Sequence, residues 1–144
     1  MIAVDTNVLV RLLTGDDPVQ EAEARLLFAR ESIWIAKTVL LETAWVLSSL
    51  YRFEDRAVRD ALTRLLGLNN VKVEDEPAVA AALAMNAQGI DIADAIHLAS
   101  RPRDTGFMTF DKAFARRAKR LGIPVVSGPI AKSPSSAERG RTGR

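Results

Sequence analysis

The chain has 144 residues, 48% of them hydrophobic and 26% charged, and its formal net charge is +2 at pH 7. These values indicate one soluble globular domain that buries about two-thirds of the surface of its unfolded chain. The sequence shows neither the pattern of a signal peptide nor the roughly 18–20 consecutive apolar residues that span a membrane. Cysteine is absent and there is one histidine, which excludes disulfides and zinc sites rich in thiolate or imidazole ligands, and we expect a cytoplasmic protein without membrane association.

Short apolar runs alternate with amphipathic stretches along most of the chain. Strands are predicted at residues 2–4, 33–35, 71–73, 107–110 and 123–126. Helices are predicted at 6–13, 18–30, 39–51, 54–66, 77–86, 91–100 and 112–121. Strands that alternate with helices predict an α/β fold with a mainly parallel central sheet covered by helices.

From residue 128 onward the sequence is poor in apolar residues and rich in Pro, Ser, Gly and Arg. This composition predicts a disordered basic tail over residues 128–144, because such a segment has too little apolar surface to bury. The folded domain is therefore expected to comprise residues 1–127.

A second concentration of positive charge lies within residues 101–120, where seven Lys or Arg residues stand against two Asp residues. Five of the basic residues lie in the helix predicted at 112–121, and four of these are the candidate RNA-binding residues: Arg116, Arg117, Lys119 and Arg120. If this basic region lies beside the acidic residues described next, the layout is the one expected of a protein that attacks a polyanion such as RNA. The same residues would equally form an ordinary solvated helix face.

Four carboxylates lie in apolar stretches of the sequence: Asp5, Glu42, Asp94 and Asp111. These surroundings predict buried side chains with few basic partners nearby. Because an unpaired buried carboxylate is strongly disfavoured, a cation held by oxygen ligands would explain them. Oxygen ligands without thiolates suit Mg²⁺ or Mn²⁺.

Asp5 and Asp111 each follow an apolar strand and precede a helix. Ligands of parallel sheets bind outside the carboxyl ends of the strands, where these side chains would project. Taken alone, each residue is better explained as a helix cap than as a ligand, although Thr6 or Asn7 could cap in place of Asp5.

Three further acids lie within or at the start of predicted helices. Glu42 has no basic residue three or four positions away and fits no capping box, so a functional role is favoured. Asp91 and Asp94 share one helix face; Asp91 is explained as a cap and Asp94 is not. His97, one turn further on, is expected to be a packed structural histidine.

Four blocks of these residues resemble the signature blocks of PIN-domain nucleases, most closely the VapC-type toxins of bacterial and archaeal toxin–antitoxin pairs. They are residues 4–9 (Val-Asp-Thr-Asn-Val-Leu), 41–47 (Leu-Glu-Thr-Ala-Trp-Val-Leu), 91–99 (Asp-Ile-Ala-Asp-Ala-Ile-His-Leu-Ala) and 109–112 (Thr-Phe-Asp-Lys). The resemblance covers residues 1–127 and implies a three-layer PIN-like fold. It implies that Asp5, Glu42, Asp94 and Asp111 form a catalytic Mg²⁺ or Mn²⁺ site. Asp91 matches a position that is often acidic and is a further candidate ligand, with Thr6, Asn7 and Thr109 as supporting residues.

The resemblance also implies an activity and partners. The activity is hydrolysis of phosphodiester bonds in structured RNA such as transfer or ribosomal RNA, and the partners are a small antitoxin and a second copy of the chain. One helix stripe, Val58, Ala61, Leu62 and Leu65, either receives such a partner or packs in the core.

Three alternatives stay open at this point. The first is a PIN nuclease of RNA processing without an antitoxin, and the second is a non-catalytic RNA-binding or scaffold domain. A phosphatase of the haloacid dehalogenase type also begins with a strand-end aspartate. It requires a second acid where this chain has Asn7, which counts against it.

Overall fold

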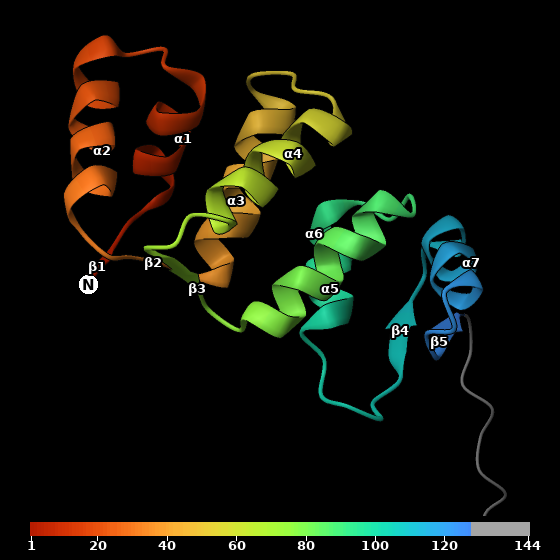
Figure 1. Ribbon diagram of the computed structural model, residues 1–144. Coiled ribbons are helices and arrows are strands. Elements are labelled where there is room, and N and C mark those ends of the chain that lie inside the picture. Colours follow the sequence, from red (N-terminus) through yellow and green to blue (C-terminus); the bar gives the residue numbers. More distant parts are fainter. Residues whose placement is uncertain (128–144) are drawn as a thin grey trace, which may run out of the picture. The chain divides into compact units, whose positions relative to one another are not determined.

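The computed structural model describes residues 1–127, and the predicted tail at 128–144 lies outside the described residues. The chain divides into two compact units, Met1–Asp104 and a second that begins at Thr105. Figure 1 identifies the elements of each unit by label and by colour along the sequence. Among the described residues, no helix is long and apolar enough to cross a membrane.

Strands and helices alternate in both units. The first unit contains β1 (Ile2–Ala3), α1 (Thr6–Thr14), α2 (Pro18–Arg30), β2 (Ile33–Ile35), α3 (Lys37–Ser49), α4 (Asp55–Leu66), β3 (Val71–Val73), α5 (Glu76–Ala87) and α6 (Ile92–Ala99). The second contains β4 (Phe107–Thr109), α7 (Lys112–Arg120) and β5 (Val125–Ser127). Every predicted element is present and the predicted α/β class is confirmed.

All strand pairs in the two units are parallel. The first unit has the strand order β1-β2-β3, with Ile2 opposite Ile33 and Ile33 opposite Val71. In the second unit β4 pairs with β5. A parallel pair needs a crossover connection, and helices supply each one: α1 and α2 between β1 and β2, α3 and α4 between β2 and β3, and α7 between β4 and β5.

The core of the first unit contains buried apolar residues of β2, α3, α4 and α6, and α3 packs against both α4 and α6. Ile33 and Ile35 are completely buried. So are Leu40 and Leu47 on α3 and Leu98 on α6. Because these residues recur at strand or helix spacing, each element turns one apolar face inward.

The stripe on α4 belongs to this core. Val58, Leu62 and Leu65 are at most 3% exposed, and Ala61 is half-buried. Helix α4 contacts α3, α5 and β3. The interpretation of this stripe as a surface for a protein partner is therefore wrong, because its side chains are already covered within the chain.

Helix α3 is held at its start by residues distant in sequence. Its N-cap residue, Ala36, offers no side-chain hydrogen bond. Instead the backbone N–H of Lys37 donates to Glu74 Oε2 at 2.9 Å, and the Lys37 ammonium lies 2.9 Å from Asp75 Oδ2. This hydrogen bond from Lys37 lowers the pKa of Asp75. The turn between β3 and α5 thus fixes the beginning of α3.

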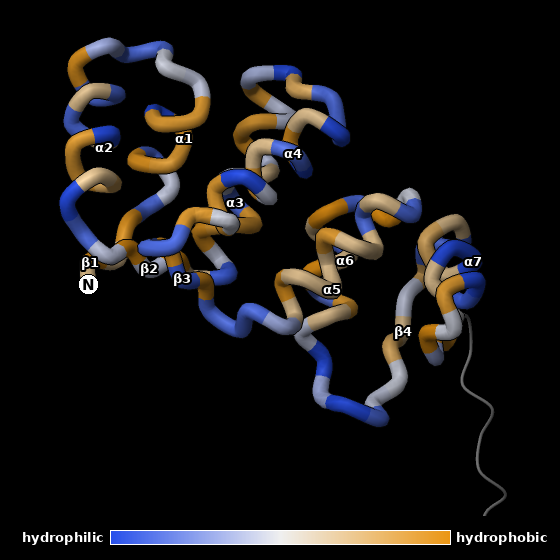
Figure 2. Tube along the Cα trace, in the orientation of Figure 1, coloured by the Kyte–Doolittle hydropathy of each residue, from blue (hydrophilic) through white to orange (hydrophobic). Residues whose placement is uncertain are grey.

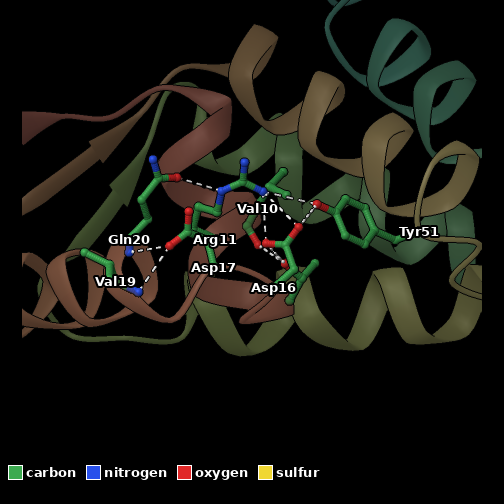
Figure 3. Close-up of polar contacts among 8 residues, drawn as sticks. Val10, Arg11, Asp16, Asp17, Val19, Gln20 and Tyr51 are labelled. Carbon is green, nitrogen blue, oxygen red and sulfur yellow. Dashed lines mark hydrogen bonds and ion pairs between the residues drawn. The ribbon is translucent and has the colours of Figure 1, made fainter.

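A second polar network joins the α1–α2 loop to the end of α3 (Figure 3). Arg11 Nη1 donates to both Asp16 oxygens, at 2.9 and 3.0 Å, and to the Tyr51 hydroxyl at 3.2 Å. The Tyr51 and Thr14 hydroxyls both donate to Asp16. The pKa of Asp16 is lowered, chiefly by the hydrogen bond from Tyr51.

Candidate active site

Asp5 follows β1 and caps α1. The backbone N–H of Val8 donates to Asp5 Oδ1 at 3.2 Å, so Asp5 itself is the cap and neither Thr6 nor Asn7 replaces it. The side chain of Asp5 is exposed and, with Asn7, lines an open pocket of about 500 Å³ between α1 and α2. Thr6 is buried. A carboxylate has acceptor positions on both oxygens, so a cap through Oδ1 leaves Oδ2 able to bind a ligand.

Glu42 lies on an exposed part of α3. Within residues 1–127 no ion pair to Glu42 is found, as its helix neighbours predict. It lines an open pocket of about 600 Å³ together with Trp45 of the same helix and His97 of α6. The expectation of a packed His97 is wrong, because this side chain is exposed on the pocket wall.

Asp91 and Asp94 lie at the start of α6. Asp91 is exposed and caps the helix, since Asp91 Oδ1 accepts from the backbone N–H groups of Ala93 at 3.0 Å and Asp94 at 3.3 Å. Asp94 is half-buried in the first helical turn. A helix N-terminus stabilises negative charge through its aligned peptide dipoles, so both acids occupy favourable positions.

The turn that leads into α6 is fixed by Asn86, a residue that the sequence did not single out. Asn86 is 2% exposed and its Nδ2 donates to the carbonyl of Ile90 at 2.9 Å. Its Oδ1 accepts from Arg59 Nη1 at 3.0 Å, and Nδ2 also lies 3.2 Å from both oxygens of Asp55. An Asn inside the apolar face of α5 was the available signal for this role.

In the second unit Asp111 caps α7. The backbone N–H of Phe114 donates to Asp111 Oδ1 at 3.0 Å. Thr109 Oγ1 accepts from the backbone N–H of Asp111 at 3.1 Å and so holds the residue in place. Asp111 is exposed, and it leads into the helix that carries the predicted basic residues.

Helix α7 is amphipathic. Phe114, Ala115 and Ala118 are buried, and the opposite side carries the α7 basic cluster, which consists of Arg116, Arg117, Lys119 and Arg120. All four are exposed, and α7 contains strongly hydrophilic positions in Figure 2. No ion pair involves them in the described part of the chain. The cluster is a solvated cationic surface.

The expectation that the four acids are buried is wrong for three of them, since Asp5, Glu42 and Asp111 are exposed. Their apolar sequence neighbours turn inward while the acids occupy helix starts or the solvent side of a helix. Burial therefore supplies no argument for a cation.

The structure also does not gather the acids of the first unit into a metal centre. Among residues 1–127 no group of three or more His, Cys, Asp or Glu side chains could hold an ion. Asp5 and Glu42 line different pockets. What does fit Mg²⁺ or Mn²⁺ is the chemistry of the donors, because all of them are carboxylate oxygens.

Comparison with known proteins shows the family. Residues 2–120 match the family described as PIN domain. The chain belongs to this family, whose members are typically metal-dependent nucleases. No curated protein matches the chain.

Proposed function

We propose that this protein is a Mg²⁺- or Mn²⁺-dependent endoribonuclease and the toxin of a toxin–antitoxin pair. The observation that supports the proposal most is the PIN domain match over residues 2–120, which includes all four acids. The toxin role is supported by the resemblance of the four acidic blocks to VapC-type toxins.

The proposed ligands of the cation are Asp5, Glu42, Asp94 and Asp111, with Asp91 as a further candidate. When bound, such a cation lowers the pKa of water and offsets negative charge on the leaving oxygen of the phosphodiester. Asp5, Asp91 and Asp111 already hold their carboxylates in fixed positions through helix caps. No side-chain nucleophile is required, in keeping with the lack of cysteine.

The proposed substrate is structured RNA such as transfer or ribosomal RNA, cleaved at an unpaired stretch. Bases outside a duplex are easier for a small protein to contact than paired ones. The α7 basic cluster would bind the phosphates. An antitoxin and a second copy of the chain are the proposed protein partners, and neither would use the buried α4 stripe.

The nuclease is tested with purified protein and RNA in Mg²⁺, Mn²⁺ or EDTA. We expect cleavage only with metal, and its loss in Asp5→Asn and Asp94→Asn. Asn is as good an N-cap as Asp, so Asp5→Asn should preserve α1. Asp60→Asn is the control. Asp60 is exposed on α4, and its contact with Arg56 is long, at 3.9 Å, so little stability should be lost with its charge. Full cleavage by both active-site variants would refute the site.

The toxin role is tested separately in cells. Induction of the chain should arrest growth, and co-expression of the product of a neighbouring small gene should restore it. RNA ends mapped after induction, compared with the Asp94→Asn variant, would identify the substrate. Cleavage without growth arrest would favour an RNA-processing nuclease, and RNA binding without cleavage would favour a non-catalytic domain.

A further inference from the structure

The pocket between α3 and α6 has a lining that the acidic residues do not explain. Its wall combines apolar side chains with an exposed indole, and its lining residues are Lys37, Thr38, Leu41, Glu42, Trp45, Ile96, His97 and Ser100. Trp45 is 58% exposed. Trp is enriched at binding surfaces, because its ring offers a large apolar area together with a polar N–H group.

We propose that this pocket binds one unpaired nucleobase of the RNA, stacked on Trp45. The inference rests on the proposed nuclease function and adds a substrate subsite to it. Proteins that bind single-stranded RNA commonly stack bases on exposed aromatic side chains, because every base has a flat π face. The volume of about 600 Å³ lies within the range of about 300–1,000 Å³ that is usual for small-molecule sites.

The pocket is held in shape before any ligand binds. Lys37, at the start of α3, donates to Ser100 Oγ at the end of α6 at 3.1 Å and to Asp75 at 2.9 Å. These contacts join the two helices at one end of the pocket. Trp45 lies two helical turns further along α3, and Ala44 and Leu47 beside it are completely buried. A preformed wall loses little conformational entropy when a base binds.

Glu42 connects the pocket to the proposed chemistry. Glu42 and Trp45 are three residues apart on α3 and therefore neighbours on one face, and both line the pocket. A base stacked on Trp45 places its nucleotide beside one of the proposed catalytic acids. Trp45 thus acts as a binding residue that selects an unpaired nucleotide next to the site of cleavage.

The charges of the pocket favour a base over a covering protein. A protein surface that sealed the pocket would close Glu42 to both water and the proposed cation, and a carboxylate buried without a cationic partner is costly. Lys37, the lysine in the lining, is already paired with Asp75. A single base covers the indole and leaves the Glu42 carboxylate accessible to water and to the proposed cation.

The test uses Trp45 as its own probe. The chain has two Trp residues, and Trp34→Phe leaves Trp45 as the sole source of indole fluorescence. We would titrate a short single-stranded oligoribonucleotide in EDTA, which separates binding from metal-dependent cleavage. We expect quenching of Trp45 and an affinity lower by about 5- to 150-fold in Trp45→Ala. Trp45→Phe should keep most of the affinity, and Leu26→Ala, which trims an exposed apolar side chain on α2, should keep all of it.

Two results would overturn the inference: absent quenching, and an unchanged RNA affinity in Trp45→Ala. If Trp45→Ala with unchanged affinity also forms a smaller oligomer, the face is assigned to protein contact. If Trp45→Ala does not fold, the inference is still tested by quenching of the native Trp45 indole and by the RNA affinity of Trp45→Phe. If the wild-type chain does not cleave RNA with metal but RNA still quenches Trp45, the nuclease proposal is refuted and the base site stands.

Discussion

Asn86 offers a quantitative test of how the start of α6 is held. Replacing Asn86 with Ala removes the donor to the Ile90 carbonyl and the acceptor for Arg59. Ile90 is 1% exposed, so water does not readily replace the lost partner of its carbonyl. Arg59 keeps its contact with Asp55 at 3.6 Å, and its side chain is 22% exposed. The lost hydrogen bond therefore costs less free energy at Arg59 than at the Ile90 carbonyl.

The expected cost follows from these environments. A buried group left without a partner costs about 1–3 kcal/mol, and a lost hydrogen bond to a charged group about 1.5–3 kcal/mol before relaxation. We expect Asn86→Ala to lower the free energy of unfolding by about 2–4 kcal/mol. For a domain of this size that corresponds to a fall in Tm on the order of 10 °C.

Urea unfolding followed by circular dichroism measures this change. Asn69→Ala is the matched control, because Asn69 is exposed in the turn after α4. Asn86→Asp should also destabilise, since it keeps the acceptor for Arg59 but places a carboxylate beside Asp55. If Asn86→Ala unfolds within about 0.5 kcal/mol of the Asn69→Ala control, the reasoning is refuted.

Three further predictions concern the ion, RNA and acid. Mn²⁺ or Mg²⁺ should raise the Tm with increasing concentration, and calorimetry should show no rise in the double variant Asp5→Asn, Asp94→Asn; an equal rise would place the ion elsewhere. Neutralising the α7 basic cluster should weaken RNA binding and flatten its salt dependence without changing the metal-induced Tm shift. Filter binding at several salt concentrations measures this dependence. An unchanged slope of RNA affinity against salt concentration would contradict the prediction. Because the pKa of Asp16 lies below the ordinary Asp value of 3.8, its contribution to stability is complete above that pH and is lost as the pH falls through the folded pKa. Tyr51→Phe should therefore destabilise near neutral pH, and its difference from wild type in urea unfolding should shrink below about pH 3.8; a difference that grows in acid would be inconsistent with this network.

Local signals in the sequence were sufficient to locate the elements. Asp17 followed by Pro18 marks the start of α2, and Asp17 does cap it, with its Oδ1 3.1 Å from two backbone nitrogens. Such signals act within a few residues, so a single sequence contains them. The start of α3 was less exact because its capping group, Glu74, lies 37 positions away, where no local pattern reaches.

The acids show a different limit of sequence reasoning. Apolar neighbours predicted burial for Glu42, but the helix turns Leu40 inward and Glu42 outward, and burial depends on this rotation. His97 was misjudged for the same reason. The choice between core and partner surface for the α4 stripe required knowledge of which helices cover it, which only the tertiary structure provides.

The caps formed by Asp5, Asp91 and Asp111 have a consequence for the thermodynamics of ligand binding. Each carboxylate is oriented by hydrogen bonds from its own helix, through one oxygen. The rotamer freedom of these side chains is therefore lost during folding and not when a cation arrives. A cation that binds any one of these carboxylates through its second oxygen would find an oriented donor, so its affinity would not be reduced by ordering that side chain, and its departure would leave that helix start intact.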